Sequence, residues 1–566
     1  QYYRDLYNAE RIEILKGPNA MIFGRGGAGG VINRVTKRAE FEPIIEGRFE
    51  GGSFGAARGL IDLGGGLGES VAARLNAVYE NSDSYRDNAG VERYGVNPSA
   101  TLSLSGATEF RLSYEYFHDG RTVDRGVPSQ NGLPYAGSRT AYFGNPDQSF
   151  SDVDVHFIAA TVEHQISSSV KLRNHTIFAD YDKFYQNVHA NSSVNAMGDV
   201  ALQAYFSGTE RRNFFNQTDL IIDWSTGSVG HTILFGGEFG HQDTENTRAA
   251  NNNAAGVVNI ADPTTFAPVT FNPLSADNSV KLMAAAVYLQ DQVELADWVM
   301  LIGGVRVDRF DLEFDDLLPA SLDFSRVDTV VSPRGGIIVK PIERASLYAS
   351  YSKSFLPQSG DQFASLTATT ASLEPERFEN IEVGFKWDLS DSLAFTGAVY
   401  RLDRDNTQAL DPMTSMTVLT GSQRSKGVEL GIVGSITEEW EIIAGYAYQE
   451  AEITSTTTAA PAGRVIPLVP KHSFSLWSAY QFTPRLGAGV GVTHQSDVFA
   501  SISNAVVLPA FTRVDAAVFL KVTERLDVQL NVENIFDETY WGTAHNDNNI
   551  TPGSPRAFRA ALTGRL

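Results

Sequence analysis

The chain has 566 residues, a formal net charge of −22 and a pI near 4.9, and it contains no cysteine. The lack of cysteine excludes disulfides and thiolate metal sites, and the acidity argues against a nucleic-acid partner. Glycine (50 residues) and aromatic residues (11 %) are abundant, which suits a β protein with many turns and interfacial rings. No run of about 20 apolar residues is present, so no membrane-spanning helix is expected.

The first distinctive stretch is Arg11 to Lys37, RIEILKGPNAMIFGRGGAGGVINRVTK. Gly24, Gly26 and Gly29 match the G-x-G-x-x-G fingerprint of dinucleotide sites. That fingerprint needs a strand before it and a helix after it, whereas strand-like sequence follows here and no amphipathic helix is found downstream. We therefore interpret these glycines as turn and close-packing residues of a small domain.

Beyond about residue 40, alternation of apolar and polar residues dominates the sequence. It is clearest in Val71–Glu80, Phe110–Tyr116, Ile381–Asp388 and Leu526–Glu533. Such strands suit two architectures. A soluble sandwich packs the apolar face on a second sheet, whereas an outer-membrane barrel turns it toward lipid and lines its lumen with the polar face. The mean hydropathy of −0.17 is compatible with a barrel.

Connection lengths favour the barrel. Short connections such as Ser105–Ala107 and Ser390–Ser392 alternate with long ones such as Asp119–Phe150 and Thr244–Ser279. Short turns on one side and long loops on the other are typical of an up-and-down outer-membrane barrel. If Thr414–Ile436 is one strand, the sequence predicts an all-β transmembrane barrel of roughly 22 antiparallel strands, wide enough to need a plug in its lumen.

Three motifs carry a resemblance to a known family. LKGP, FGRG and GGVINRVTKR closely resemble the end of the plug domain of TonB-dependent outer-membrane receptors, especially siderophore receptors. NVENIFDETY resembles the penultimate-strand motif of the family, and SPRAFRAALTGRL resembles the closing strand, although it ends in Leu566 where the family usually has an aromatic residue. The resemblance implies that residues 1–42 are the C-terminal portion of the plug and residues 43–566 the 22-stranded barrel.

The resemblance also implies a function. The protein would be an active-transport receptor in the outer membrane of a Gram-negative bacterium, importing a ferric siderophore with energy transmitted by TonB. Its partners would be the ferric siderophore, the TonB–ExbB–ExbD complex through an N-terminal segment absent from this sequence, outer-membrane lipids and the barrel-assembly machinery. The alternatives are another cargo, such as a hydroxamate siderophore, a cobalamin-like cofactor or a saccharide, and a passive pore or adhesin.

No enzyme motif is present: G-x-S-x-G, H-E-x-x-H, the P-loop and C-x-x-C are all missing from the sequence. We expect no catalytic residue, no resident cofactor and no metal site. His156 and His164 would share one strand face, and we interpret them as lumen or wall residues, with a metal site there as the alternative. Loop aspartates such as Asp243, Asp262, Asp547 and those near Asp316 are candidates for binding divalent cations that bridge surface lipids.

Contacts between plug and barrel follow from the resemblance. Glu382 in NIEVGFK and Glu429 in SKGVELG resemble barrel glutamates that plug arginines bridge to in related receptors. We transfer the arginine role to Arg11 and Arg25. Such pairs would anchor the plug, because a charge screened from water needs a partner. Solvated lumen charges are the alternative.

The ligand is expected to meet the loop Asp119–Phe150, where DRGVPS and YFGNPDQSFS resemble the corresponding loop of siderophore receptors, including catecholate receptors. A ferric catecholate is a bulky anion with aromatic rings, which arginine and tyrosine hold through charge and stacking. A hydroxamate chelate is more neutral and would be held mainly by aromatic residues. Ordinary loop packing is the alternative for each candidate: Tyr116, Arg121, Arg125, Tyr135, Tyr142 and Phe143.

Overall fold

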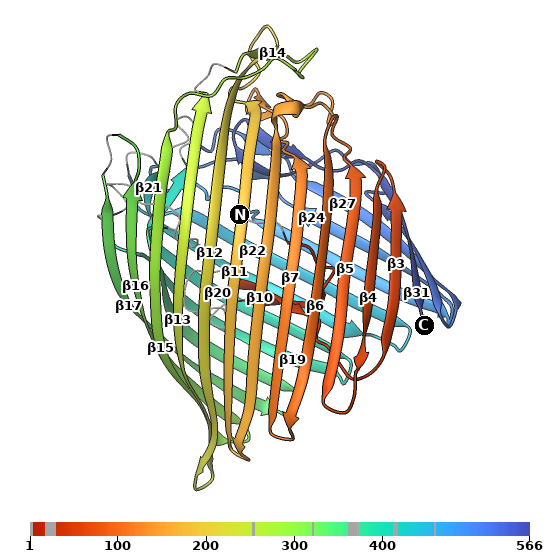
Figure 1. Ribbon diagram of the computed structural model, residues 1–566, viewed down its shortest axis with the longest axis vertical. Coiled ribbons are helices and arrows are strands. Elements are labelled where there is room, and N and C mark those ends of the chain that lie inside the picture. The colour runs from red at the N-terminus through yellow and green to blue at the C-terminus, as the bar shows by residue number, and fades with distance from the viewer. Residues whose placement is uncertain are drawn as a thin grey trace.

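The structure, a computed structural model, describes residues 4–16, 30–251, 255–319, 322–359, 371, 373–410, 417–457 and 460–566. Within these residues, 22 antiparallel strands form a closed barrel, as the sequence predicts (Figure 1). Consecutive wall strands pair with one another, and β3 pairs with β31 to close the ring. No helix among the described residues is long and apolar enough to cross a membrane.

The wall strands, in chain order, are β3 (Ile44–Gly52), β4 (Ala57–Gly66), β5 (Val71–Asp83), β6 (Gly90–Ser105), β7 (Thr108–Thr122), β10 (Phe150–Ser167), β11 (Val170–Ala190), β12 (Asp199–Thr226), β13 (Val229–Asn251), β15 (Ala276–Ala296), β16 (Val299–Asp316), β17 (Phe324–Ile342), β18 (Ala345–Leu356), β19 (Glu376–Ser390), β20 (Leu393–Leu410), β21 (Thr417–Ser435), β22 (Trp440–Ile453), β23 (His472–Thr483), β24 (Leu486–Gln495), β27 (Phe511–Thr523), β28 (Leu526–Glu533) and β31 (Ala557–Arg565).

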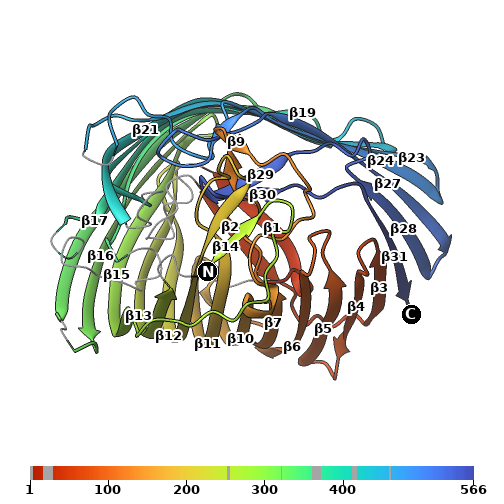
Figure 2. The ribbon, with the colours of Figure 1, turned by 90° about the horizontal axis from the view of Figure 1, so that it is seen from above.

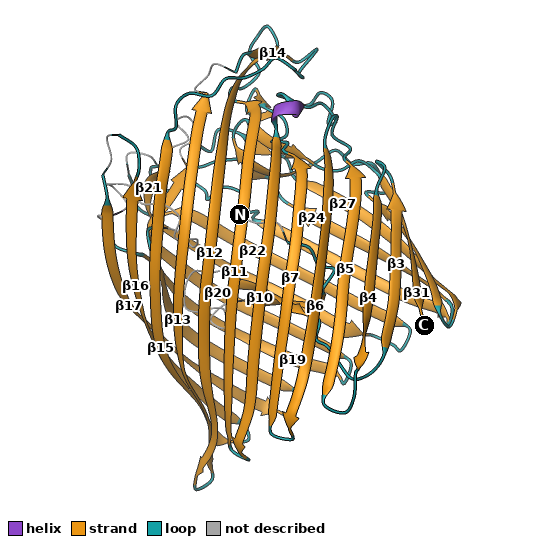
Figure 3. Ribbon diagram, viewed as in Figure 1, coloured by secondary structure: helices purple, strands orange, loops and turns teal. Residues whose placement is uncertain are grey.

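Short elements lie outside the wall: β1 (Ala9–Lys16), β2 (Gly30–Thr36), β8 (Ser129–Gln130), β9 (Leu133–Pro134), β14 (Val257–Asn259), β25 (Val498–Phe499), β26 (Val507–Leu508), β29 (Trp541–Asn546), β30 (Asn549–Pro552) and the 3-10 helix η2 (Pro146–Gln148). Figure 3 shows η2 at the rim where the long connections emerge, which we call the long-loop rim. In outer-membrane barrels this rim faces the cell exterior.

The two faces of the wall have opposite character, and β15 shows this clearly. Met283, Val287 and Leu289 point outward and are about half exposed, whereas Leu282 and Tyr288 are buried on the lumen side. A strand places successive side chains on opposite faces, so the alternation read in the sequence becomes an apolar exterior. Exposed apolar side chains repeat over the whole wall, as expected where the exterior contacts lipid.

One side of the barrel rises far beyond a bilayer. A membrane-spanning strand needs about 9–11 residues, whereas β12 has 28 and β13 has 23. In Figure 1 these strands reach toward β14, which pairs with the start of β12 at the top of the molecule. The start of β12 and the end of β11 therefore lie well outside the bilayer, with their lumen sides facing the mouth of the barrel.

The long loops pack on one another at the mouth. Their apolar side chains form a single cluster, the loop core, which includes Phe143, Val188, Leu202, Leu508 and Ile550. A backbone bridge joins Val127 to Ile550, with N···O distances of 2.8 and 3.0 Å. Gly126 has φ +81°, and a Cβ there would lie 1.9 Å from the Ile550 carbonyl oxygen, so this close approach requires glycine.

A small hairpin lies inside the ring. Strands β1 and β2 pair antiparallel as a separate two-stranded sheet, and Figure 2 shows them within the barrel. The chain then leaves this hairpin and enters the wall at Ile44, the first residue of β3. The glycine-rich turn of the hairpin, residues 17–29, lies outside the described residues.

The outward face generates a first prediction. The substitution Val287→Arg places a charge among lipid-facing side chains and is expected to lower the free energy of unfolding by about 2–4 kcal/mol in phospholipid vesicles. Guanidinium unfolding in vesicles measures this. The control is Ser279→Arg on the same face of β15, nearer the long-loop rim and beside Glu245 and Asp315, which should change stability little. Equal losses for both variants would contradict a lipid-facing Val287.

Candidate functional site

The hairpin is joined to the wall by ion pairs. Glu115 of β7 is 2 % exposed and accepts hydrogen bonds from two cations of the N-terminal segment. Arg4 lies 2.8 Å and Arg34 3.1 Å from its carboxylate oxygens. The Arg4 guanidinium also stacks over the Phe157 ring at 5.3 Å. A carboxylate this buried needs both partners, since either one alone leaves hydrogen-bonding capacity unfilled.

A second ion pair has the opposite polarity. Asp5 belongs to the N-terminal segment and accepts two hydrogen bonds from Arg58 of β4, at 2.8 and 2.6 Å, with Arg93 of β6 at 3.5 Å. Burial alone would raise the pKa of Asp5, but the hydrogen bonds and charge of Arg58 outweigh it and the pKa is lowered. The carboxylate therefore stays ionised at neutral pH.

A third ion pair joins the segment after β2 to the wall. Lys37, just after β2, lies 2.8 Å from Asp62 of β4, and Arg74 of β5 holds the same carboxylate at 2.7 Å. Three carboxylates thus fix the open end of the hairpin, where the chain enters β1 and leaves β2, to β4, β6 and β7 on one side of the lumen.

For Arg11, the described residues show a different partner from the one inferred from the resemblance. Arg11 is exposed and pairs with Glu13 of its own strand at 2.7 Å, and the described residues do not bring it to Glu382 or Glu429. Glu382 instead accepts a hydrogen bond from Tyr348 at 2.6 Å, and Glu429 lies on β21 opposite Ala398 and Ala447. The reason is geometric: Arg34 lies opposite Ile12 and Arg11 opposite Val35, so strand alternation turns the two arginines to opposite faces of the hairpin.

Arg25, the second arginine of that prediction, falls in residues 17–29 and lies outside the described residues.

Above the hairpin, two arginines and two tyrosines meet on the lumen face near the long-loop rim. Arg125 donates to the Tyr185 hydroxyl at 3.1 Å and to the Tyr205 hydroxyl. The Arg248 guanidinium lies over the Tyr205 ring at 4.0 Å, and the two tyrosine rings stack at 5.4 Å. We call Arg125, Arg248, Tyr185 and Tyr205 the basic–aromatic cluster.

The charge of this cluster is not neutralised locally. Among the described residues, no carboxylate forms an ion pair with Arg125 or Arg248, although most wall arginines pair with an aspartate or glutamate. Burial raises the pKa of Tyr205, so its hydroxyl remains neutral. Two cations over stacked phenol rings suit an anionic ligand that itself carries aromatic rings.

The other predicted ligand residues have different surroundings. Tyr142 is 1 % exposed and donates to the Val123 carbonyl at 2.7 Å, Phe143 belongs to the loop core, and Tyr135 packs edge-to-face on Phe143 at 5.6 Å. Arg121 lies 2.5 Å from Asp119. For these residues the structure shows loop packing or internal pairing, the alternative noted from the sequence.

Tyr116 lies on the outward face of β7. Its neighbours Glu115 and Phe117 are buried toward the lumen, so the alternation of the strand turns Tyr116 the other way, where it donates to Asp154 at 2.7 Å. The alternation was visible in the sequence, since Tyr116 shares a face with Leu112 and Tyr114. Tyr116 therefore does not reach the basic–aromatic cluster.

Sequence reasoning missed Tyr185, Tyr205 and Arg248. They lie on β11, β12 and β13, which look like ordinary wall strands in the sequence. The length of these three strands could have identified the residues from the sequence. A strand of more than 20 residues must leave the bilayer and present one end at the mouth of the barrel.

The anchoring of the hairpin gives a second prediction. Replacing Glu115 by alanine leaves Arg4 and Arg34 without their carboxylate, and removal of one partner of a buried pair typically costs about 3–5 kcal/mol. We expect the variant to loosen the hairpin and to raise the ion conductance of single molecules in planar bilayers. Glu13→Ala, which removes an exposed pair from the same hairpin, is the control and should leave the conductance low. Unchanged conductance in the Glu115 variant would contradict the anchoring role.

The β29–β30 hairpin gives a prediction for pH. Burial, with a smaller effect of the Arg125 charge, lowers the pKa of His545 to about 4. In the unfolded chain the pKa is about 6.5. Protonation therefore favours the unfolded form, and the contribution of His545 to stability is complete above about pH 6.5 and declines as the pH falls toward 4. Thermal unfolding measured from pH 7.5 to 4.5 should show a smaller decline for His545→Asn. Parallel curves for the two proteins would contradict a neutral His545.

Comparison with known proteins agrees with this geometry. The family model described as TonB dependent receptor-like, beta-barrel matches residues 82–535. The probable TonB-dependent siderophore receptor PiuA of Acinetobacter baumannii is 27 % identical, over 99 % of this chain and 82 % of its own. The metal-pseudopaline receptor CntO of Pseudomonas aeruginosa is 31 % identical, over 99 % of this chain and 80 % of its own.

Solved structures give the same result. The crystal structure of PiuA superposes with a TM-score of 0.91 at 25 % identity, covering 100 % of this chain and 87 % of that one. The closed form of the ferric-catecholate import receptor Fiu from Escherichia coli K12 superposes with a TM-score of 0.89 at 26 % identity, with the same coverage. The resemblance found in the sequence is confirmed: this chain belongs to the TonB-dependent receptor β-barrel family and is an outer-membrane β-barrel like its relatives in Gram-negative bacteria.

Proposed function

We propose that the protein binds a ferric siderophore, preferably of the catecholate type, at the long-loop rim and imports it across the outer membrane with energy transmitted by TonB. The observation that carries this is the basic–aromatic cluster: two arginines without carboxylate partners among the described residues, over two stacked tyrosines. The relatives support the class of cargo, since PiuA is named a siderophore receptor and Fiu a ferric-catecholate import receptor.

The physical argument concerns the local field. A net charge of −22 would repel an anionic chelate at long range. Debye screening limits that repulsion to about 8 Å at physiological ionic strength, so the charges nearest the ligand decide its binding. Arg125 and Arg248 make this part of the mouth positive, and Tyr185 and Tyr205 offer ring faces to a catechol. The same pair of rings would hold a neutral hydroxamate chelate without the charge contribution.

Transport then requires the lumen to open. In the proposed scheme residues 1–42 act as the end of the plug and residues 43–566 as the barrel, and the three carboxylate contacts hold the plug while the ligand binds. Force from TonB, with ExbB and ExbD, would displace the plug. Outer-membrane lipids and the barrel-assembly machinery are the remaining proposed partners. The scheme involves no bond chemistry, no catalytic residue and no resident cofactor, and the ferric chelate is cargo.

Ligand titration tests the proposal. Hydrogen bonds to charged groups contribute about 1.5–3 kcal/mol, so Arg125→Ala and Arg248→Ala should each weaken the binding of a ferric catecholate roughly 10- to 100-fold. Quenching of intrinsic fluorescence in detergent measures the affinity. Arg309→Ala is the control, because Arg309 is exposed on β16 and pairs with Asp311 at 3.7 Å.

The same titration is carried out with the other candidate classes of cargo. Tighter binding of a ferric hydroxamate, a cobalamin or a saccharide than of any ferric catecholate would overturn the catecholate assignment. A high steady conductance of the unsubstituted protein would favour the passive pore instead. Uptake by iron-limited cells that carry or lack the gene completes the test, since loss of transport of one ferric chelate is the expected result.

A further inference from the structure

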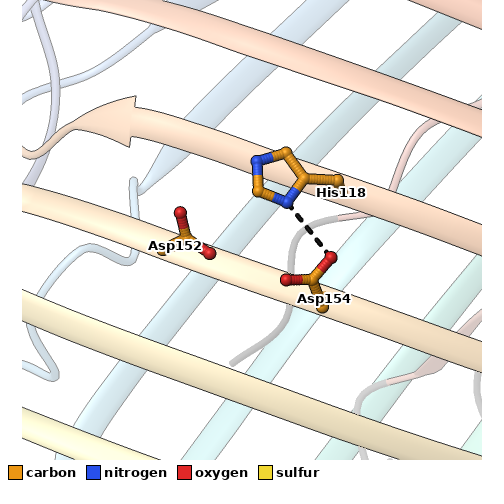
Figure 4. A group of neighbouring side chains, drawn as sticks. All are labelled: His118, Asp152 and Asp154. Carbon is orange, nitrogen blue, oxygen red and sulfur yellow. Dashed lines mark hydrogen bonds and ion pairs between the residues drawn. The ribbon is translucent and has the colours of Figure 1, made fainter.

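A second group of chemically distinctive side chains lies on the opposite face of the wall. His118 of β7 and Asp152 and Asp154 of β10 all point outward, away from the lumen (Figure 4). Their chain neighbours Phe117, Asp119 and Val153 are buried on the lumen side, which fixes the orientation of the three. The group is therefore separate from the basic–aromatic cluster, and an inference about it does not depend on the proposed function.

The register of the two strands brings the three donors together. Asp154 lies directly opposite His118, and Asp152 lies opposite Gly120, whose missing side chain leaves space next to the imidazole. One donor atom from each side chain lies within 4.8 Å of the other two. The His118 Nδ1 and an Asp154 oxygen are 3.1 Å apart.

Two of the donors are held by aromatic residues of the same face. The Tyr116 hydroxyl donates to Asp154 at 2.7 Å, and the Tyr94 ring stacks on the His118 imidazole with centroids 4.7 Å apart and planes at 22°. Asp152 is exposed, and no described residue forms a hydrogen bond or ion pair with it. His118 and Asp154 are thus held in place, and the carboxylate of Asp152 beside them is free to rotate.

The surroundings add negative charge. Asp182 of β11 lies directly opposite Asp154, and Asp180 lies opposite His156 two residues along. Arg212 compensates Asp180 at 3.1 Å. A cation placed among Asp152, Asp154 and Asp182 would relieve repulsion among three carboxylates that the wall holds on one face.

The charged side chains of Asp180, Asp182 and Arg212 beside the group indicate that it lies beyond the lipid-contacting band of the wall. Leu112 of β7 and Ile158 of β10 are exposed apolar side chains of the same outward face. His118 lies six residues beyond Leu112 toward the long-loop rim, which at about 3.3 Å per residue is roughly 20 Å along the strand. Ions from the medium can therefore reach the three donors.

We propose that His118, Asp152 and Asp154 form a binding site for a divalent metal ion of the zinc type on the outward face of the barrel. An imidazole nitrogen with two carboxylate oxygens suits Zn²⁺, whereas Ca²⁺ and Mg²⁺ take oxygen ligands. Bonds of about 2.0–2.2 Å in a tetrahedral site place ligand atoms about 3.4 Å apart, so metal binding requires a rotation of the exposed Asp152 and little movement of the other two. Water would fill the fourth position.

Equilibrium dialysis of the full chain in detergent at pH 7.5, after removal of bound metal with a chelator, tests the site with Zn²⁺ and Ca²⁺ in separate arms. We expect Zn²⁺ to bind in preference to Ca²⁺, and His118→Ala and Asp152→Asn each to weaken the tightest class of Zn²⁺ sites at least tenfold. The control is His494→Ala, which removes another outward histidine, hydrogen-bonded to Thr512 at 2.8 Å on a distant part of the wall, and should leave Zn²⁺ binding unchanged.

No Zn²⁺ binding above the detergent blank, equal binding by all variants, or preference for Ca²⁺ would each overturn the proposal. A second measurement avoids reliance on variants that fail to fold. Crystals of the unsubstituted protein soaked in Zn²⁺ should give an anomalous difference peak between His118 and the two aspartates, and the absence of a peak there would also overturn it.

Discussion

The whole arrangement depends on carboxylates that are buried against the lumen side of the wall. A barrel of 22 strands is too wide for its own side chains to fill, so its lumen needs a separate body, and that body must be attached through a polar surface. The attachment uses Glu115 and Asp62 of the wall and Asp5 of the N-terminal segment, each held by more than one cation. Taking these charges out of water is costly, and the cost is recovered only while all partners are in place.

The alternation of side chains along a strand allows β7 to carry two groups with different chemical roles. Successive residues of a strand point to opposite faces, so Glu115 of β7 holds the hairpin while His118, three residues later, belongs to the proposed metal site on the exterior. A shift of register by one residue would exchange these faces and bury the histidine in the lumen. Pairing of β7 with β6 and β10 over most of its length holds the register against that shift.

The sequence allowed the barrel, its strand number and its family to be predicted, because period-2 alternation and connection lengths are local properties of the chain. It did not allow the contacts between distant segments to be predicted. Arg11 and Arg34 lie on paired strands of one hairpin, yet only Arg34 reaches Glu115, because the register turns the two arginines to opposite faces and that register is not visible in the sequence. Arg125 was identified as a ligand candidate, but its partners Tyr185 and Tyr205 are 60 and 80 residues away in the chain.

Ionic attachment of the hairpin also bears on how the lumen can open. An apolar interface of the same size would be held by contact area, and a small displacement would expose apolar surface to water without any replacement interaction. An ion pair that is pulled apart exchanges its partner for water, so each charge is solvated as it leaves. A hairpin held by three such groups at its open end is therefore firmly attached at rest, yet a force along the barrel axis can release it contact by contact, and the same pairs re-form when the force is removed.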